Sequence, residues 1–494
     1  MNYMEDFFNQ FREGIIGIDH SLVSPDGNHI PLVYADWTAS GRLYGPIEDR
    51  LREEIMPLVA NTHTETSTTG MAMTHAYHTA QELIKKHVNA GQGDLILTCG
   101  SGMTGVINKF QRILGLKVNP DFQTKIDEKD RPVVFITHME HHSNQTSWME
   151  TIAEVEIIPP DETGLVDLQA LDRLLEKYEN KKIKIASVSA CSNVTGIRTP
   201  YHKIARLMHR EGGYCFVDFA CAAPYVDINM HPDIPGGDLD AIFFSPHKFL
   251  GGPGTSGVLI FNRSLYNRTA PDQPGGGTVD WTNPWGEHKY VDDIEAREDG
   301  GTPAFLQTIK AAMCISLKEE MGVDRILARE HHLVDLLWDL ISPLPNLHIL
   351  AQQHRDRLAV VSFYIDDLHF NLGVRLLNDK FGIQARGGCS CAGTYGHYLL
   401  HIDPGRSREI VEMIGQGDYS KKPGWIRVSL HPTMTDREVR YIGESIRKLA
   451  KNHQAWRDEY NFDPACLELV PKKSNPDQAI RESILSALTR DFVT

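Results

Sequence analysis

The chain has 494 residues, which predicts more than one domain, and its composition is that of an ordinary globular protein. Fifty lysine and arginine residues stand against 65 aspartate and glutamate residues, and this net charge of −15 disfavours a general binder of nucleic acid or anionic membranes. No stretch approaches the roughly 20 apolar residues of a membrane helix, and the acidic N-terminal segment is unlike a secretory signal. Eight cysteines are too few for a disulfide scaffold, so we expect reduced thiols and a cytoplasmic location.

Seven short apolar segments alternate with helical patterns between residues 94 and 262, and we expect each segment to be a strand. Most are continuously apolar, which is typical of strands covered on both faces. Strand, helix, strand in repetition predicts a largely parallel sheet that binds ligands at the carboxyl ends of its strands. The segments are DLILT (94–98), PVVFIT (132–137), VEIIP (155–159), IKIASVSA (183–190), YCFVDFA (214–220), AIFFS (241–245) and SGVLIF (256–261).

Two of the intervening helices have clear ends. Asp167 is placed to cap a helix in which Leu168, Leu171, Leu174 and Leu175 share one face. A second helix begins at Pro200 and ends at the glycines that follow residue 211.

The second half of the chain has a different pattern. Residues 301–322 predict a long helix leaving the sheet domain, and the later segments suggest a smaller α+β domain. The amphipathic stretch at 478–493 either packs on that smaller domain, which we favour, or docks a partner. We therefore expect an N-terminal segment that packs on the smaller domain (1–40), a large domain (41–312), the smaller domain (313–455) and a C-terminal extension (456–494).

A lysine stands at the end of one predicted strand, in SPHKFLGGPGTSG. An amine of reference pKa about 10.4 becomes a nucleophile when it is desolvated, and such lysines form Schiff bases with aldehydes. A solvated turn lysine is the alternative for any single residue of this kind. Three other sites favour a reactive role for Lys248.

The three sites also follow predicted strands. LTCGSGMTGVIN (97–108) places a glycine turn before a helix start, where free N–H groups and the hydroxyl of Thr104 could hold a phosphate. Asp218 ends an apolar strand, and beside a pyridine nitrogen its carboxylate would keep that nitrogen protonated. The third site is the histidine-rich loop THMEHHSNQTSW (137–148).

These features, in this chain order, resemble the fold-type I pyridoxal-phosphate enzymes. The closer resemblance is to the class V aminotransferases, a group that includes cysteine desulfurases and selenocysteine lyases. It runs from YADWTASGRL (34–43) to about residue 447 and is most specific in SPHK with its glycine loop, in MEHHSN and in SNVTG (192–196). The resemblance implies an α/β fold: a large domain with a mainly parallel seven-stranded sheet, a smaller α+β C-terminal domain, and a homodimer with a shared active site.

The resemblance also implies roles for single residues. Lys248 would form a Schiff base with pyridoxal 5'-phosphate, His141 would stack on the ring, and Asp218 would pair with the ring nitrogen. The other implied cofactor contacts are Thr104, Ser245 and His247 at the phosphate, Met103, Asn193 and Cys221 nearer the ring, and Thr302 reaching the phosphate of the neighbouring subunit. The implied substrate-binding residues are Arg427, which would clamp the α-carboxylate, Arg386 and Ala39.

Cys221 is a departure from the resemblance. Many relatives have glutamine or histidine at this position, which contacts the ring oxygen, whereas a thiol is a poor hydrogen-bonding group. The departure leaves the reaction less certain than the cofactor.

The segment ARGGCSCAG (385–393) bears on the reaction. It resembles the corresponding segment of desulfurases, with Cys391 placed to take sulfur from L-cysteine as a persulfide, while Lys248 removes the Cα proton and alanine leaves. Cys389 could relay the sulfur, and a sulfur-acceptor protein is a further expected partner. Transamination, epimerisation or β-elimination on another amino acid is the alternative, and the choice between sulfur and selenium stays open.

A metal protein and a scaffold are the two alternatives of a different class. Zinc bound by His138, His141, His142 and the two cysteines of CSC would leave Lys248 and Asp218 unexplained, and the CSC spacing is unlike a usual zinc site. A scaffold that has lost its chemistry would not need the intact reactive residues. We therefore expect no metal site, and we expect His75 and His78 to be surface or packed residues.

Overall fold

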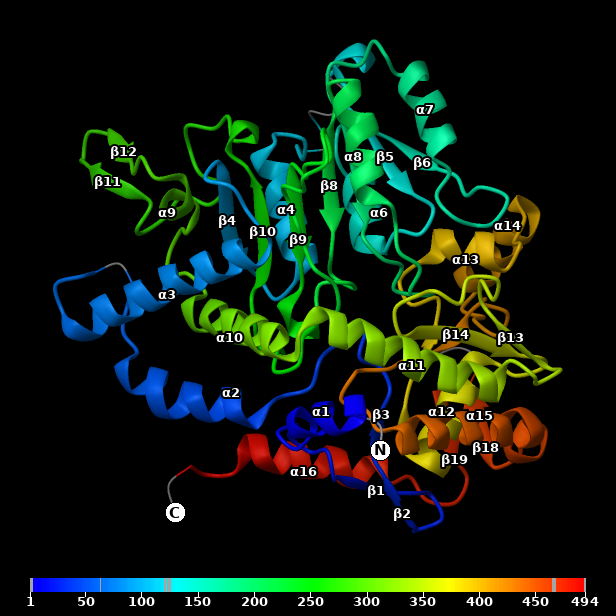
Figure 1. Cartoon of the computed structure of the whole chain (residues 1–494). Helices are drawn as coiled ribbons and strands as arrows, with labels where there is room; N and C mark the ends of the chain where they lie inside the picture. The colour runs from blue at the N-terminus through cyan, green and yellow to red at the C-terminus, as the bar shows by residue number, and fades with distance from the viewer. Residues whose placement is uncertain (1–2, 63, 120, 122–125, 464–467, 493–494) are drawn as a thin grey trace.

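The computed structural model describes residues 3–62, 64–119, 121, 126–463 and 468–492. The seven predicted strands form one seven-stranded sheet in the order β4-β10-β9-β8-β7-β5-β6 (Figure 1). Only β10 runs antiparallel to its two neighbours; the other pairings are parallel, so the predicted fold class is confirmed. The strands are β4 (Asp94–Cys99), β5 (Val133–Thr137), β6 (Glu154–Ile158), β7 (Lys184–Ser189), β8 (Tyr214–Asp218), β9 (Ala241–Phe244) and β10 (Gly257–Asn262).

Both faces of this sheet are buried, which explains the continuously apolar strands. Alternate residues of one strand enter different cores: Phe216 of β8 packs in one cluster, whereas Cys215 and Val217 pack in the other. Helices α4 and α6 cover the face of Phe216, and α3, α7, α8 and α10 contribute to the opposite core. These helices are α3 (Thr68–His87), α4 (Met103–Ile113), α6 (His142–Met149), α7 (Leu168–Lys177), α8 (Tyr201–Arg210) and α10 (Phe305–Met321).

The predicted helix ends are confirmed at two places. Asp167 caps α7 by accepting hydrogen bonds from the backbone N–H groups of Gln169 and Ala170. Helix α8 begins directly after Pro200 and ends before Gly212.

A second, antiparallel sheet lies in the C-terminal half, in the order β13-β14-β17-β16. The short strand β3 (Val33–Tyr34) near the N-terminus pairs in parallel with β15 (Ile383–Gln384). In the sequence, β15 comes just before β16 of the second sheet. The boundaries expected at residues 40, 312 and 455 stay predictions. The elements of this half are β13 (Leu347–Ile349), β14 (Val360–Ile365), β16 (Arg386–Gly388), β17 (Trp425–Ser429), α11 (Val323–Ile341), α12 (Phe370–Phe381), α13 (Gly393–Leu399), α14 (Pro404–Gly415) and α15 (Asp436–Arg457).

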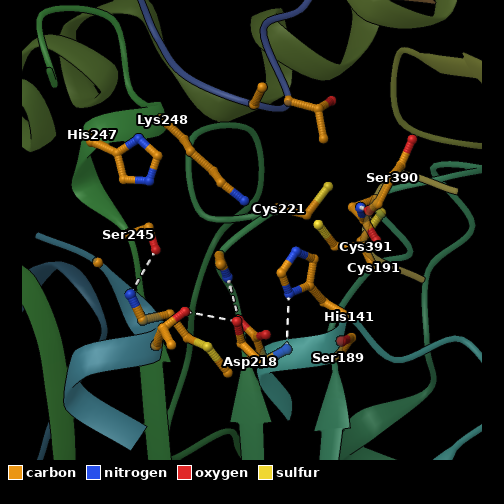
Figure 2. A pocket seen from close by; sticks show the side chains of 18 of the residues that line it. His141, Ser189, Cys191, Asp218, Cys221, Ser245, His247, Lys248, Ser390 and Cys391 are labelled. Atoms are coloured by element: carbon orange, nitrogen blue, oxygen red, sulfur yellow. Dashed lines mark hydrogen bonds between the residues drawn. The ribbon is translucent and has the colours of Figure 1, made fainter. Parts of the chain in front are cut away.

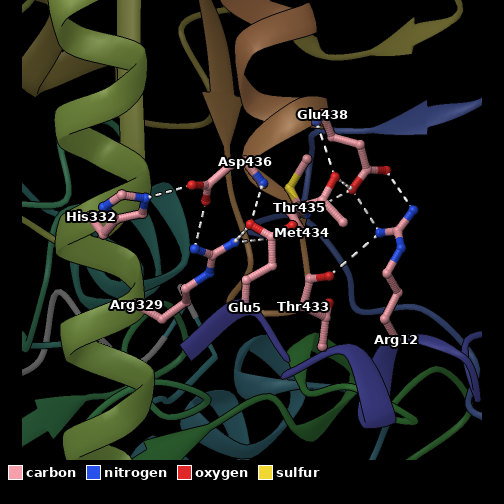
Figure 3. A network of polar contacts seen from close by, with 9 residues as sticks. All are labelled: Glu5, Arg12, Arg329, His332, Thr433, Met434, Thr435, Asp436 and Glu438. Carbon is pink, nitrogen blue, oxygen red and sulfur yellow. Dashed lines mark hydrogen bonds and ion pairs between the residues drawn. The ribbon is translucent and has the colours of Figure 1, made fainter. Parts of the chain in front are cut away.

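The N-terminal helix α1 (Tyr3–Arg12) is fixed to this half by ion pairs (Figure 3). The fully buried Arg329 of α11 pairs with Asp436 at 2.6 Å and reaches Glu5 of α1 at 3.4 Å. Arg12 makes a two-pronged contact to Glu438 at 2.7 and 2.8 Å, and Glu438 closes the capping box of α15. Farther along the chain, Asp36 forms an isolated parallel bridge with Ser429 of β17.

The expected amphipathic helix of the extension is α16 (Asp477–Thr489). Its apolar residues Ile480, Ile484 and Leu488 share one face, yet all three are exposed, and no residue of α16 is buried. The first residue of α16, Asp477, pairs with Arg375 of α12 at 2.5 Å, so the helix contacts the smaller domain by an ion pair at its N-terminus and not through its apolar face. In the described part of the chain no helix is long and apolar enough to cross a membrane.

The remaining elements are short. They are α2 (Gly45–Arg50), α9 (Ile294–Glu298), β1 (Ser21–Val23), β2 (His29–Pro31), β11 (Val279–Thr282), β12 (His288–Tyr290), β18 (Tyr460–Asp463) and β19 (Glu468–Pro471).

Candidate active site

A cavity of about 460 Å³ opens where strands of the large sheet end, and the predicted site residues meet in it. Figure 2 shows the Lys248 side chain extending into this space toward Cys221 and His141. Thr302 is the one predicted residue outside the cavity lining; it is exposed in the loop between α9 and α10. The predicted residues that line the cavity are Ala39, Met103, Thr104, His141, Asn193, Asp218, Cys221, Ser245, His247, Lys248, Arg386, Cys391 and Arg427.

One wall of the cavity is the N-terminus of α4. The Met103 N–H donates to the Ser245 hydroxyl at 2.8 Å, and the Thr104 and Ser143 hydroxyls lie 2.7 Å apart. A side chain at Gly102 would come within 3.1 Å of the Ser245 hydroxyl, so glycine keeps this turn open. Helix-start N–H groups together with hydroxyls form a donor set suited to a phosphate.

Lys248 follows β9 in a single turn of 3-10 helix, and its chain is partly buried. Burial lowers the pKa of its amine, an effect that Cys221 and Asp218 oppose and Arg427 reinforces. Among the described residues none forms a hydrogen bond or ion pair with the Lys248 Nζ atom. No described residue therefore competes for this amine, and its reactive role stays a prediction.

Asp218 ends β8 at the floor of the cavity and is only 5% exposed. Burial raises the pKa of its carboxyl to about 7, although the Ala220 N–H, which donates to it at 2.8 Å, acts in the opposite direction. A buried carboxyl that lacks a strong cationic partner fits a protonated ring nitrogen, which would supply one.

His141 precedes α6 and caps it, because its Nδ1 atom accepts a hydrogen bond from the Ser143 N–H at 3.1 Å. Burial, helped by the neighbouring Lys248, lowers the pKa of His141 to about 3. The imidazole is therefore neutral at ordinary pH, and a neutral flat ring suits stacking on an aromatic ligand.

Glu140 anchors this loop, and the sequence reasoning missed it. Its buried carboxylate accepts hydrogen bonds from the side chains of Thr137 (2.6 Å), Asn144 (2.7 Å) and Ser189 (2.6 Å). The network ties the end of β5 to the end of β7 and so fixes His141 over the cavity. The only signal in the sequence was a carboxylate three residues after a buried strand.

Asp36 is a second missed residue, and it joins the two predicted substrate arginines. Arg386 and Arg427 lie directly opposite one another on β16 and β17. The Asp36 carboxylate accepts from the Arg427 Nη2 atom at 2.6 Å and from the Arg386 Nε atom at 3.0 Å. Arg427 also donates to the Asn193 carbonyl at 3.0 Å, so its fork is rigidly aimed.

Cys391 sits on a strained loop at the cavity mouth. It and Ser390 adopt positive φ values of 58° and 51°, which non-glycine residues seldom adopt. The Asn193 side chain donates to the Ser390 carbonyl at 2.7 Å, and the His142 N–H donates to the Cys391 carbonyl at 2.7 Å. Cys391 is exposed and lines the cavity, whereas Cys389 is half-buried and does not.

Figure 2 shows Cys221 beside the end of the Lys248 side chain, and Cys221 has a thiol neighbour that the sequence reasoning missed. Cys191 follows β7, lines the same cavity and hydrogen bonds to Cys221. Both thiols are buried, and each also lies near the Ser192 carbonyl.

The described residues contain no cluster of three or more histidine, cysteine, aspartate or glutamate side chains that could hold a metal ion. Two of the histidines weighed as zinc ligands have other partners. His138 contacts the Gly164 carbonyl at 3.2 Å, and His142 accepts from the Gly393 N–H at 3.0 Å.

Known proteins resemble this chain over most of its length. A probable cysteine desulfurase of Halalkalibacterium halodurans is 29% identical over 375 residues, which is 75% of this chain and 86% of the relative. A probable cysteine desulfurase of Staphylococcus aureus is 27% identical over 380 residues, 76% of this chain and 86% of the relative.

Solved structures share the fold. The apo structure of a cysteine desulfurase from Thermococcus onnurineus NA1 superimposes with a TM-score of 0.72 at 22% identity, covering 90% of this chain and 98% of that one. The cysteine desulfurase CsdA of Escherichia coli gives a TM-score of 0.69 at 19% identity over 90% of this chain and 98% of its own. The profile of the aminotransferase class-V family matches residues 33–442, so this chain is a member of that family.

Proposed function

We propose that this protein is a pyridoxal-phosphate enzyme that removes sulfur from L-cysteine. The observation that carries the proposal is the meeting, in one cavity, of a free lysine amine, a buried carboxyl and an exposed thiol: Lys248, Asp218 and Cys391. The relatives named as probable cysteine desulfurases support it.

The residues present fit the cofactor. Thr104, Ser245, His247 and the open turn at Gly102 would hold its phosphate, and Met103 would be a further contact. The ring would lie against His141 with its nitrogen at Asp218, while Asn193 and Cys221 would face its hydroxyl side. Bound pyridoxal phosphate would supply an aldehyde for amines and a ring that withdraws electrons from the substrate Cα.

The chain's own groups have separate tasks in the proposed reaction. Arg427, aimed by Asp36, would bind the substrate carboxylate, with Arg386 and Ala39 beside it. The amine of Lys248, whose pKa is lowered by burial, would take the Cα proton at Nζ and return it later. His141 stays neutral because burial lowers its pKa, so it adds no positive charge above the ring.

Cys391 would carry out the sulfur transfer. Its thiolate attacks the substrate sulfur, the substrate Cβ–S bond breaks, and a Cys391 persulfide forms while the carbon takes a proton and leaves as alanine. L-Cysteine and one thiol thus give alanine and one persulfide, and no outside oxidant is needed. The exposed, strained loop of Cys391 suits a group that must reach the substrate and then pass sulfur to an acceptor.

The cofactor is tested by colour and by covalent trapping. Protein expressed with pyridoxal phosphate should be yellow, and borohydride should bleach it while fixing the cofactor mass on the peptide of Lys248. The Lys248→Ala variant should carry no fixed mass. A colourless protein, or mass fixed on another lysine, would contradict the cofactor assignment.

The reaction is tested with L-cysteine by measuring sulfide, with a reducing thiol present, and alanine. Cys391→Ala should abolish both products, and Cys389→Ala is the matched control, since that thiol lies two residues away but outside the cavity lining. Unchanged activity of Cys391→Ala would remove Cys391 from this role. Transfer of an amino group to a keto acid without sulfide would favour another class V reaction.

The expected assembly is a homodimer in the cytoplasm. The exposed Thr302 would then reach the phosphate bound by the second copy, and a separate protein would accept the sulfur. Mixing Thr302→Ala with Lys248→Ala subunits should restore part of the activity if the sites are shared.

A further inference from the structure

The two thiols at the floor of the cavity, Cys191 and Cys221, have no part in the proposed sulfur transfer. They follow neighbouring strands: β7 and β8 pair in parallel, with Ser189 opposite Asp218, so both cysteines lie just past the same edge of the sheet. The turns that follow the two strands bring both sulfur atoms to one backbone group, the Ser192 carbonyl.

The side chains of the pair point at one another. Cys191 hydrogen bonds to Cys221, and their sulfur atoms lie 3.5 and 3.9 Å from the same acceptor, the Ser192 carbonyl oxygen. Both line the cavity, which is large enough to admit a small oxidant. Figure 2 shows the two side chains on the same side of the cavity.

The two thiols differ in electrostatic environment. The hydrogen bond from Cys191 lowers the pKa of Cys221, and nearby Lys248 and Arg427 act in the same direction, although burial opposes them. Burial raises the pKa of Cys191 well above its ordinary value. Cys221 is therefore the better nucleophile, with a protonated thiol beside it.

We propose that Cys191 and Cys221 form an oxidisable dithiol site, which peroxide converts to a disulfide and which a cofactor in the cavity shields. The Cys221 thiolate attacks hydrogen peroxide, giving a sulfenic acid and hydroxide. Cys191 then attacks the sulfenic sulfur, so that a disulfide and water form. A small dithiol supplies the two electrons and two protons that restore both thiols.

The experiment uses the full chain with Cys389→Ser and Cys391→Ser, which removes the exposed thiol and its neighbour. Peroxide treatment followed by alkylation and tryptic mapping should link the peptide of residues 185–198 to that of residues 211–248, and dithiothreitol should reverse the link. Because the second peptide also contains Cys215, fragmentation must place the bond at Cys221. Oxidation without this cross-link would overturn the proposal.

Two controls keep the outcome specific. Adding Cys191→Ser should abolish the link, whereas adding Cys314→Ser, which changes a buried thiol outside the cavity, should not. If the Cys191→Ser variant does not fold, the tryptic map of the protein that retains both Cys191 and Cys221 is sufficient to test the proposal. With pyridoxal phosphate at about ten times its Kd, cross-linking should slow about tenfold, and an unchanged rate would overturn the shielding. None of these measurements depends on sulfide production, so the proposed reaction can fail while the dithiol site stands.

Discussion

Replacing Asp218 by asparagine should stabilise the cofactor-free protein while it weakens cofactor binding. The carboxyl is buried, and its raised pKa of about 7 means that the native state disfavours the ionised form. An asparagine Oδ1 atom can still accept from the Ala220 N–H, and its amide would face the cavity. The substitution therefore removes a charge and keeps the hydrogen bond that the Asp218 side chain accepts from the Ala220 N–H.

The sign and size of the effect follow from proton linkage. Between the ordinary pKa of 3.8 and the native value of about 7, the folded protein binds a proton that the unfolded chain has released, so stability falls as pH rises. At about 1.4 kcal/mol per pH unit, the full cost above pH 7 is about 4 kcal/mol. The gain of the variant should be fully present at pH 8 and absent near pH 4.

Thermal unfolding of wild type and Asp218→Asn at pH 4 and pH 8 measures this. For a chain of this length, 1 kcal/mol corresponds to about 1 °C, so the variant should melt about 2 to 4 °C higher at pH 8 and no higher at pH 4. Added pyridoxal phosphate should stabilise wild type more than the variant. An equal difference at both pH values would refute the reasoning.

A control with the same chemical change lies on the surface. Asp403 caps α14, where the backbone N–H groups of Arg406 and Gly405 lower the pKa of its carboxyl. The linkage has the opposite sign, so Asp403→Asn should not raise the melting temperature at pH 8 relative to pH 4.

Three further changes test other parts of the site. Arg427→Lys should raise KM for L-cysteine roughly 10- to 100-fold, because a point charge would replace a charged two-pronged contact to the substrate carboxylate worth about 1.5 to 3 kcal/mol. Steady-state kinetics would measure this change in KM. A change in kcat alone would contradict the prediction. Glu140→Gln should lower the free energy of unfolding, measured by urea titration, by about 2 to 3 kcal/mol. The carboxylate accepts five hydrogen bonds, and the NH2 group of glutamine would face a donor in the place of one acceptor oxygen. An unchanged midpoint would show that this network does not stabilise the fold. Gly257→Ala would place a methyl group 2.5 Å from the Gly102 carbonyl oxygen, so it should displace the turn at Gly102 and weaken binding of pyridoxal phosphate. Gly276→Ala is the control, because the space around Gly276 is open. Equal affinity in both variants would count against a phosphate site at this turn.

The large sheet could be predicted because its strands carry a strong local signal. Consecutive apolar residues such as Phe216 and Val217 make a strand apolar on both faces. Both faces are buried only when helices cover both sides of the sheet. The apolar periodicity at 478–493 was equally clear, and a helix forms there. A periodic pattern gives the face that seeks a partner but not the partner itself, so the exposure of Ile484 could not be foreseen.

The meeting of Lys248 and Asp218 in one cavity could be predicted for a related physical reason. A lysine or aspartate at the end of a buried strand or in the turn that follows it is costly unless it has a task, which made Lys248 and Asp218 conspicuous. The residues that restrain them carry no such mark. Asp36 reaches Arg427 across 391 positions of the chain, and that pairing exists only because β3 joins β15 beside the second sheet.

Cys191 is a second residue whose partner could not be predicted from the local sequence. A single cysteine after a strand is an ordinary small apolar residue, and the sequence offered no reason to connect it with Cys221. The two cysteines meet because β7 and β8 are parallel neighbours in the sheet, so the carboxyl ends of both strands lie at the same edge. Local sequence therefore points to candidate groups one at a time, while the order of the strands decides which of them lie next to each other.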